Sequence, residues 1–172
     1  MSQMLPFISE SSWRRLKRFP GSRVIAFQAA DGSPQIPAQL MAIGWNQQVL
    51  TFADFEKIAR RERVLVGLVP TRVLAGAFMV RRGWPVIILQ ESLRGAARSF
   101  IAFHELGHYF LHDPHLPADC GQRELEADLV AYGALIPQHL VRSCSVGEIV
   151  NKYGYPRQMV TARIEMLRCF GL

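Results

Sequence analysis

The segment SFIAFHELGHYFLHD, from Ser99 to Asp113, places two histidines and a glutamate inside a largely apolar stretch. The apolar residues recur at helical spacing, which predicts a buried helix. A buried imidazole or carboxylate that lacks a partner costs about 1–3 kcal/mol or more. The sequence therefore indicates that His104, Glu105 and His108 share a partner that satisfies their polar groups.

The three residues have the spacing of the HExxH pattern. His104 and His108 are four residues apart, so their imidazoles lie on one helix face and can bind one zinc ion. Glu105 lies about 100° around the helix from His104 and can reach a metal-bound water without binding the metal. Zinc lowers the pKa of its bound water toward about 7, and a carboxylate then takes the proton as the water attacks a carbonyl group. The pattern predicts a zinc peptidase with His104 and His108 as ligands and Glu105 as catalytic base.

Catalytic zinc needs a third protein ligand, which must come from elsewhere in the chain. His112 continues the four-residue series, but it lies one turn, about 5.4 Å, further along, so we expect a supporting or surface role for it. In the segment ELEAD, we expect Glu124 to bind zinc and Asp128 to accept the N–H of a zinc-bound histidine. Glu126 competes for the ligand role. The alternative for all three acids is an ordinary acidic first turn of a helix.

The order of segments predicts a single α+β domain over residues 1–172, because a helical part is followed by strands and then only by helices. Residues 1–62 are expected to be helical or irregular, and residues 63–90 to form a small antiparallel sheet packed against the mainly helical remainder. Residues 95–137 hold the two expected zinc-site helices, and residues 145–171 predict a pair like a helix-turn-helix. Strands are expected at residues 24–27, 64–69, 73–80 and 85–89, and helices at residues 13–19, 52–62, 96–112, 122–135, 146–153 and 157–170.

Local signals refine some of these elements. Thr51 with Asp54, and Ser145 with Glu148, have the spacing of capping boxes and predict helix starts. Gly107 loses about 1 kcal/mol of helix propensity relative to alanine, so it indicates that another backbone passes close by. We expect that backbone to belong to the sheet.

The composition is that of one folded domain. The chain has 172 residues, of which 49% are hydrophobic and 20% charged, so a sizeable core can form and disorder is excluded. The formal net charge is +6, but no run of like charge exceeds two residues, which favours a scattered basic surface over a nucleic-acid site. Three widely spaced cysteines indicate reduced thiols. No apolar signal region or membrane-spanning window occurs, so we expect a cytoplasmic protein without membrane contacts.

Three stretches in the second half of the chain resemble the ImmA/IrrE family of zinc metallopeptidases. They are FIAFHELGHYFLHD at residues 100–113, ELEADLVAYGALIP at residues 124–137 and KYGYPRQMVTARIEML at residues 152–167. The resemblance implies a zincin-like bundle and a cytosolic, gluzincin-like protease with Zn²⁺. It also implies a protein substrate, an Xre-type helix-turn-helix repressor whose cleavage relieves repression in mobile elements or stress responses.

The sequence departs from the family pattern at three positions. Ile101 and Phe103 replace the threonine and alanine that members often have, and Asp128 replaces the usual asparagine. A carboxylate at Asp128 still accepts a hydrogen bond from a histidine. We therefore expect catalysis to tolerate these differences, whereas substrate choice depends more on them.

Several roles stay open. The group that stabilises the oxyanion besides zinc is not determined by the sequence, and the candidates are Tyr132, His115 and His139. The hairpin at residues 73–89, with its turn at residues 81–83, either binds an extended peptide at a free edge or belongs to the core. The oligomeric state is also open.

The C-terminal helix pair allows another interpretation. Arg157, Gln158, Thr161 and Arg163 would suit the major groove of DNA, but the apolar residues between them favour core packing. We therefore do not expect direct nucleic-acid binding. A further alternative is a catalytically silent module in which zinc joins two helices and the protein only binds a repressor.

Overall fold

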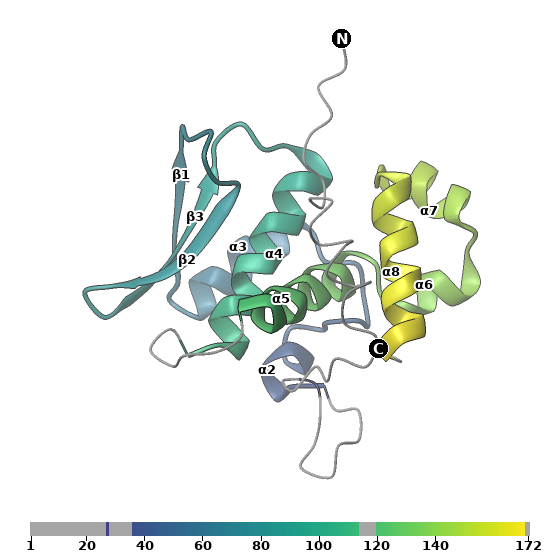
Figure 1. Cartoon of the computed structure of the whole chain (residues 1–172), viewed down its shortest axis with the longest axis horizontal. Coiled ribbons are helices and arrows are strands. Elements are labelled where there is room, and N and C mark those ends of the chain that lie inside the picture. The colour runs from purple at the N-terminus through teal and green to yellow at the C-terminus, as the bar shows by residue number, and fades with distance from the viewer. Residues whose placement is uncertain (1–26, 28–35, 114–119, 171–172) are drawn as a thin grey trace.

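The computed structural model describes Phe27 and residues 36–113 and 120–170 (Figure 1). The helix expected at residues 13–19 and almost all of the strand expected at residues 24–27 lie outside this part. Within it, a three-stranded sheet lies beside a larger group of helices, and the two longest helices lie between the sheet and the C-terminal helices. This arrangement confirms the predicted α+β class.

The sheet has the strand order β1-β3-β2. β1 is Leu65–Val69, β2 is Gly76–Arg81 and β3 is Trp84–Gln90. β2 and β3 form the predicted antiparallel hairpin, and its turn residues Arg82 and Gly83 have φ angles of 52° and 80°. Two positive φ angles are typical of a type I′ turn, whose twist matches that of the paired strands. The turn therefore sets the register of the hairpin.

β1 departs from the prediction, because it runs parallel to β3. The expectation of a purely antiparallel sheet is therefore wrong, and the sheet is mixed. Residues 70–75 carry the chain past the C-terminal end of β3, where the backbone N–H of Gln90 donates to the carbonyl oxygen of Ala75 at 2.9 Å. β3 thus lies between β1 and β2. Apolar runs identify strands, but they do not determine which strands become neighbours.

The two longest helices, α4 (Gly95–Leu111) and α5 (Cys120–Leu135), pack against each other. At Gly107, an added Cβ atom would lie 3.0 Å from the Cα of Ala127 and 3.1 Å from the Cβ of Val130. Glycine therefore allows the two backbones to approach. The close approach predicted at Gly107 is confirmed. The backbone that approaches belongs to α5, so the expectation that it would belong to the sheet is wrong. A glycine inside a helix indicates that another element packs closely there, but it does not identify that element.

Shorter helices flank this pair. α2 (Ala38–Met41) and α6 (Gln138–Ser143) are too short to show a helical period, and the sequence did not predict them. α3 (Phe52–Arg61) begins with the predicted capping box, in which the backbone N–H of Thr51 donates to the Asp54 carboxylate at 3.0 Å. α3 therefore starts where the sequence predicted, and it packs against α4.

The C-terminal helices α7 (Val146–Tyr153) and α8 (Arg157–Phe170) have the predicted bounds. α7 starts at the predicted capping box of Ser145 and Glu148. The pair contributes several buried apolar residues, namely Ile149, Met159, Val160, Ala162 and Met166. Arg163, considered above for DNA contact, has an exposed fraction of 0%. Its side chain therefore belongs to the protein core.

One hydrophobic core joins the sheet to the helices. β3 contributes Ile87 and Leu89, and α4 contributes Phe103 and Leu106, all of them fully buried. Apolar packing on these faces holds α4 in place beside α5. None of the described helices combines the length and the apolar character that crossing a bilayer requires.

Candidate metal centre

The side chains of His104, His108 and Glu124 come together where α4 packs against α5. The Nε2 atoms of the two histidines are 3.1 Å apart. Glu124 Oε2 lies 3.5 Å from Nε2 of His104, and its Oε1 lies 3.4 Å from Nε2 of His108. One ligand atom from each residue lies within 4.8 Å of the other two. The structure thus brings together the three residues that the sequence proposed as ligands, while ligation itself stays a prediction.

The hydrogen bonds of His104 leave an electron pair facing this cluster. The Asp128 carboxylate lies 2.9 Å from Nδ1 of His104, and an ionised carboxylate can only accept, so Nδ1 carries the hydrogen. In a neutral imidazole, Nε2 of His104 then has a lone pair directed at His108 and Glu124. Converging lone pairs and a carboxylate repel one another unless a cation lies between them. The donor set therefore fits a divalent metal ion such as zinc.

The pKa shifts of His104 and Glu124 also show that the cluster favours a bound positive charge. Burial lowers the pKa of His104, but the hydrogen bonds to Asp128 and Glu124 outweigh it and raise that pKa to about 10. Hydrogen bonds from His104 and His108 hold the pKa of Glu124 well below its usual range. Both shifts arise because anionic oxygens lie next to imidazole nitrogens. The cluster therefore favours a bound cation, either a proton or a metal ion.

Glu105 lies against β2, one of the two edge strands of the described sheet. An added Cβ atom on Gly76 would lie 2.9 Å from Oε1 of Glu105. The backbone N–H of Phe78 donates to the Glu105 carboxylate. Burial raises the pKa of Glu105, and this effect exceeds the opposing effect of the charges on His104 and His108. A carboxylate with a raised pKa accepts protons more readily near neutral pH. This environment suits a general base, the role that stays predicted for Glu105.

Glu126, the competing ligand candidate, contacts a different residue. Its Oε2 lies 2.9 Å from Nε2 of His112, and its Oε1 accepts from Nε2 of Gln122 at 3.1 Å. His112 in turn places its Nδ1 2.9 Å from Nδ1 of His108. The two acids thus have separate partners, because Glu124 reaches the candidate ligands and Glu126 reaches His112. Sequence reasoning missed this contact of His112, although the four-residue repeat of histidines was a signal for it.

The three candidates for oxyanion stabilisation have different locations. Tyr132 has an exposed fraction of 1%, and its hydroxyl has no hydrogen-bond partner among the described residues. Burial raises the pKa of Tyr132 well above its ordinary value, so the hydroxyl keeps its hydrogen. His139 is exposed on α6, and His115 lies outside the described part. The structure therefore selects none of the three.

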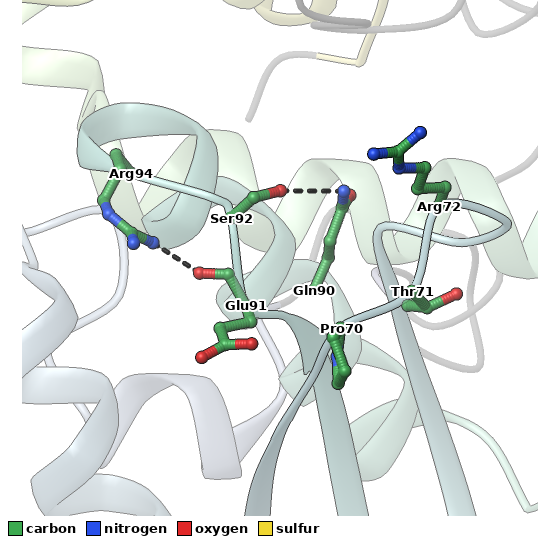
Figure 2. A pocket seen from close by; sticks show the side chains of 7 residues that line it. All are labelled: Pro70, Thr71, Arg72, Gln90, Glu91, Ser92 and Arg94. Atoms are coloured by element: carbon green, nitrogen blue, oxygen red, sulfur yellow. Dashed lines mark hydrogen bonds between the residues drawn. The ribbon is translucent and has the colours of Figure 1, made fainter.

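A cavity of about 790 Å³ lies between the loop after β1 and the segment that joins β3 to α4 (Figure 2). Arg94 donates there to the backbone carbonyl oxygen of Glu91. The lining residues are Pro70, Thr71, Arg72, Gln90, Glu91, Ser92 and Arg94. His104, His108 and Glu124 are absent from this lining, so the cavity is not part of the candidate metal centre.

Two packed helices that present two histidines and a glutamate, next to a buried carboxylate, define a site of the metallopeptidase type. The sequence model of the Peptidase M78 family, described as the IrrE N-terminal-like domain, matches residues 54–165. The chain therefore belongs to this peptidase family, which confirms the resemblance to the ImmA/IrrE metallopeptidases. The match begins in α3 and ends in α8, so it includes the sheet as well as the second half of the chain. No curated protein matches the chain.

Proposed function

We propose that the protein is a zinc-dependent endopeptidase that cleaves an Xre-type helix-turn-helix repressor and thereby relieves repression. Membership of a peptidase family supports the hydrolytic part of the proposal. The observation that carries it is the convergence of His104, His108 and Glu124 next to the buried Glu105. The repressor substrate, and the cytoplasm as the place of action, rest on the resemblance to the ImmA/IrrE family.

In this proposal His104, His108 and Glu124 hold zinc, which when bound polarises the peptide carbonyl group and acidifies the attacking water. Glu105 takes a proton from that water as the water oxygen attacks the carbonyl carbon. The same carboxyl group then gives the proton to the amide nitrogen, which leaves as an amine when the C–N bond breaks. The raised pKa of Glu105 suits both transfers. Asp128 keeps His104 in the tautomer whose Nε2 faces the ligand position.

No described strand pairs with the outer edge of β2, and this edge supports a mode of substrate binding. β3 pairs with β2 on one side, where Ala75 accepts a hydrogen bond from Gln90. Because the directions of backbone groups alternate along a strand, those of Gly76 and Phe78 face the other side. The N–H of Phe78 donates to Glu105, so this edge runs past the carboxylate. An extended peptide that pairs with β2 would therefore pass the reacting groups, as in β-augmentation.

The test is incubation of the purified, zinc-loaded protein with the Xre-type repressor encoded beside it, with and without a chelator, followed by mass spectrometry. We expect cleavage that the chelator abolishes. The matched variant Glu105→Gln keeps the shape of the side chain but removes the base, so cleavage should fall at least about 100-fold while zinc content and repressor binding persist. An intact repressor in the zinc-replete reaction contradicts the proposal. Repressor release by Glu105→Gln would instead indicate action by binding alone.

A further inference from the structure

A row of three histidines runs along α4 and ends at a glutamate of α5. Nε2 of His108 faces His104, whereas Nδ1 of His108 lies 2.9 Å from Nδ1 of His112. Nε2 of His112 lies 2.9 Å from Oε2 of Glu126. The side chains of His112 and Glu126 are only 7% and 5% exposed. We propose that His112 and Glu126 position His108 for metal binding by fixing its tautomer and ring orientation, an inference that rests on the metal site of the proposed function.

The hydrogen bonds in this row have one consistent direction. Glu126 receives a hydrogen bond from Gln122 on Oε1, and its ionised carboxylate can only accept, so Nε2 of His112 carries a hydrogen and donates to Oε2. In a neutral His112 the lone pair then lies on Nδ1, where it can accept from Nδ1–H of His108. His108 is left with a lone pair on Nε2, the atom that faces Glu124. The row therefore directs the free electron pair of His108 toward the metal position.

The end of α4 explains why His112 supports a ligand rather than acting as one. His112 is the C-cap residue, with φ −123° and ψ 123°, so the chain leaves the helix at this position. One helical turn, about 5.4 Å, separates it from the level of His108. His104 lies one turn further away still, so His112 cannot reach an ion that His104 and His108 bind together, but its ring lies next to that of His108 at a centroid distance of 5.0 Å. The same spacing that excludes His112 as a ligand thus makes it a neighbour of His108.

The two candidate ligands of α4 are held in different ways. Asp128 contacts Nδ1 of His104 directly with a carboxylate, at 2.9 Å. His108 contacts the imidazole of His112, and the Glu126 carboxylate lies on the far side of that ring. A partner that accepts the second N–H of a metal-binding histidine fixes its tautomer and orientation and raises its basicity. We therefore expect the tautomer and ring orientation of His108 to depend on both His112 and Glu126. Those of His104 depend on Asp128 alone.

Two substitutions of His112 in the full chain test this role. His112→Phe keeps a ring but removes both nitrogens, whereas His112→Gln keeps one acceptor and one donor. We expect His112→Phe to lower the zinc affinity, measured by competition with a chelating dye, by about 10–100-fold. We expect His112→Gln to recover most of this loss. Nitrogen NMR of the histidine side chains should show a mixed tautomer of His108 in His112→Phe, a change that a merely structural role would not cause.

Glu126→Gln tests the far end of the row and serves as the test if His112→Phe does not fold. Loss of the anionic acceptor should lower the zinc affinity several-fold and alter the tautomer signals of His112. Glu165→Gln is the matched control, because Glu165 is a carboxylate on α8 that pairs with Arg168 at 2.9 Å, and it should leave zinc affinity unchanged. A wild-type protein that binds no zinc contradicts the proposed function. Normal zinc binding and an unchanged His108 tautomer in every folded variant would overturn the positioning role alone.

Discussion

Two buried regions next to α5 hold charge in opposite ways. At the candidate metal centre, burial lowers the pKa of His104, but hydrogen bonds to Asp128 and Glu124 raise it to about 10. In the second region, Arg163 of α8 is fully buried, and burial lowers its pKa to about 10. The first region offers acceptors to a cation, whereas the second contains its own cation. Burial of a charged group therefore does not by itself indicate a binding site, but a surplus of converging acceptors does.

Arg163 connects α8 to the rest of the domain through neutral oxygen atoms. Its Nε donates to the carbonyl oxygen of Ile136 at 3.0 Å, and its Nη2 donates to Oδ1 of Asn46 at 2.7 Å. Asn46 Oδ1 also accepts from the backbone N–H of Gln138 at 2.8 Å. A guanidinium keeps its proton near neutral pH, so this region holds its own cation, although Nη1 of Arg163 has no hydrogen-bond partner among the described residues. We expect it to contribute stability, and the metal centre to contribute function.

The largest effect should come from removing a ligand from the metal centre. Glu124→Ala is expected to lower zinc affinity about 1000-fold, because each ligand supplies a large share of the roughly 10–16 kcal/mol found for zinc sites with four protein ligands. Since hydrogen bonds from His104 and His108 lower the pKa of Glu124, the metal-free variant should also lose some free energy of unfolding at neutral pH, but only a little because the side chain is 41% exposed. Chelator competition and urea denaturation measure the two quantities. A loss of zinc affinity below about tenfold would remove Glu124 from the ligand set.

The second region should respond in the opposite way. Arg163→Ala is expected to lower the free energy of unfolding by about 3 kcal/mol. The substitution leaves a cavity and removes the N–H groups that donate hydrogen bonds to Ile136 and Asn46. Zinc affinity should stay within about threefold of the wild type. Urea denaturation at neutral pH gives the first value, and chelator competition gives the second. Equal stability of Arg163→Ala and the wild type would show that the polar contacts of Arg163 are dispensable.

A smaller change at the helix contact should affect the metal centre more than the Arg163 region. Gly107→Ala places a methyl group 3.0 Å from the Cα of Ala127, and the resulting strain exceeds the gain of about 1 kcal/mol in helix propensity. We expect a net loss of about 1 kcal/mol in the free energy of unfolding and a several-fold loss in zinc affinity, measured by the same two methods. Gly67→Ala is the control, since an added Cβ atom there would have no described residue within 4 Å apart from its chain neighbours. Identical behaviour of the two variants would contradict a tight α4–α5 contact.

The smallest effect concerns Asp54, an acid at the start of α3 with no role in either buried region. Hydrogen bonds from Thr51 lower the pKa of Asp54 from its ordinary value of 3.8. The ionised group therefore stabilises the fold above about pH 4, and this contribution disappears as the pH falls through the lowered pKa. Asp54→Asn should cost about 0.5–1 kcal/mol at pH 7 and less at pH 3, as measured by thermal unfolding. An equal cost at both pH values would mean that the charge of Asp54 is unimportant.

Local patterns predicted the helices best. The bounds of α7 and α8 agree with the sequence prediction, and both capping boxes are present. Such signals depend on residues within one or two turns of one another, so no long-range contact is needed to interpret them. α2 and α6 escaped prediction because four and six residues are too few for a period to appear.

The candidate site was predictable in part for the same reason. Four-residue spacing places His104 and His108 on one helix face in any α-helix. The distances from Glu124 to both histidines, and from Asp128 to His104, required the packing of α5 on α4. Sequence spacing within a single helix could not supply these distances, because they join residues of two helices.

The sequence by itself determined the helix that presents the two histidines, the starts of α3 and α7, and the hairpin of β2 and β3, since each depends on neighbouring residues and backbone preferences. Only the tertiary structure decided that β1 runs parallel to β3 and that Gly107 meets α5. It also decided that Glu126 contacts His112, whereas Glu124 faces the ligand position. These outcomes depend on how distant segments pack, and packing selects among partners that local patterns leave equivalent.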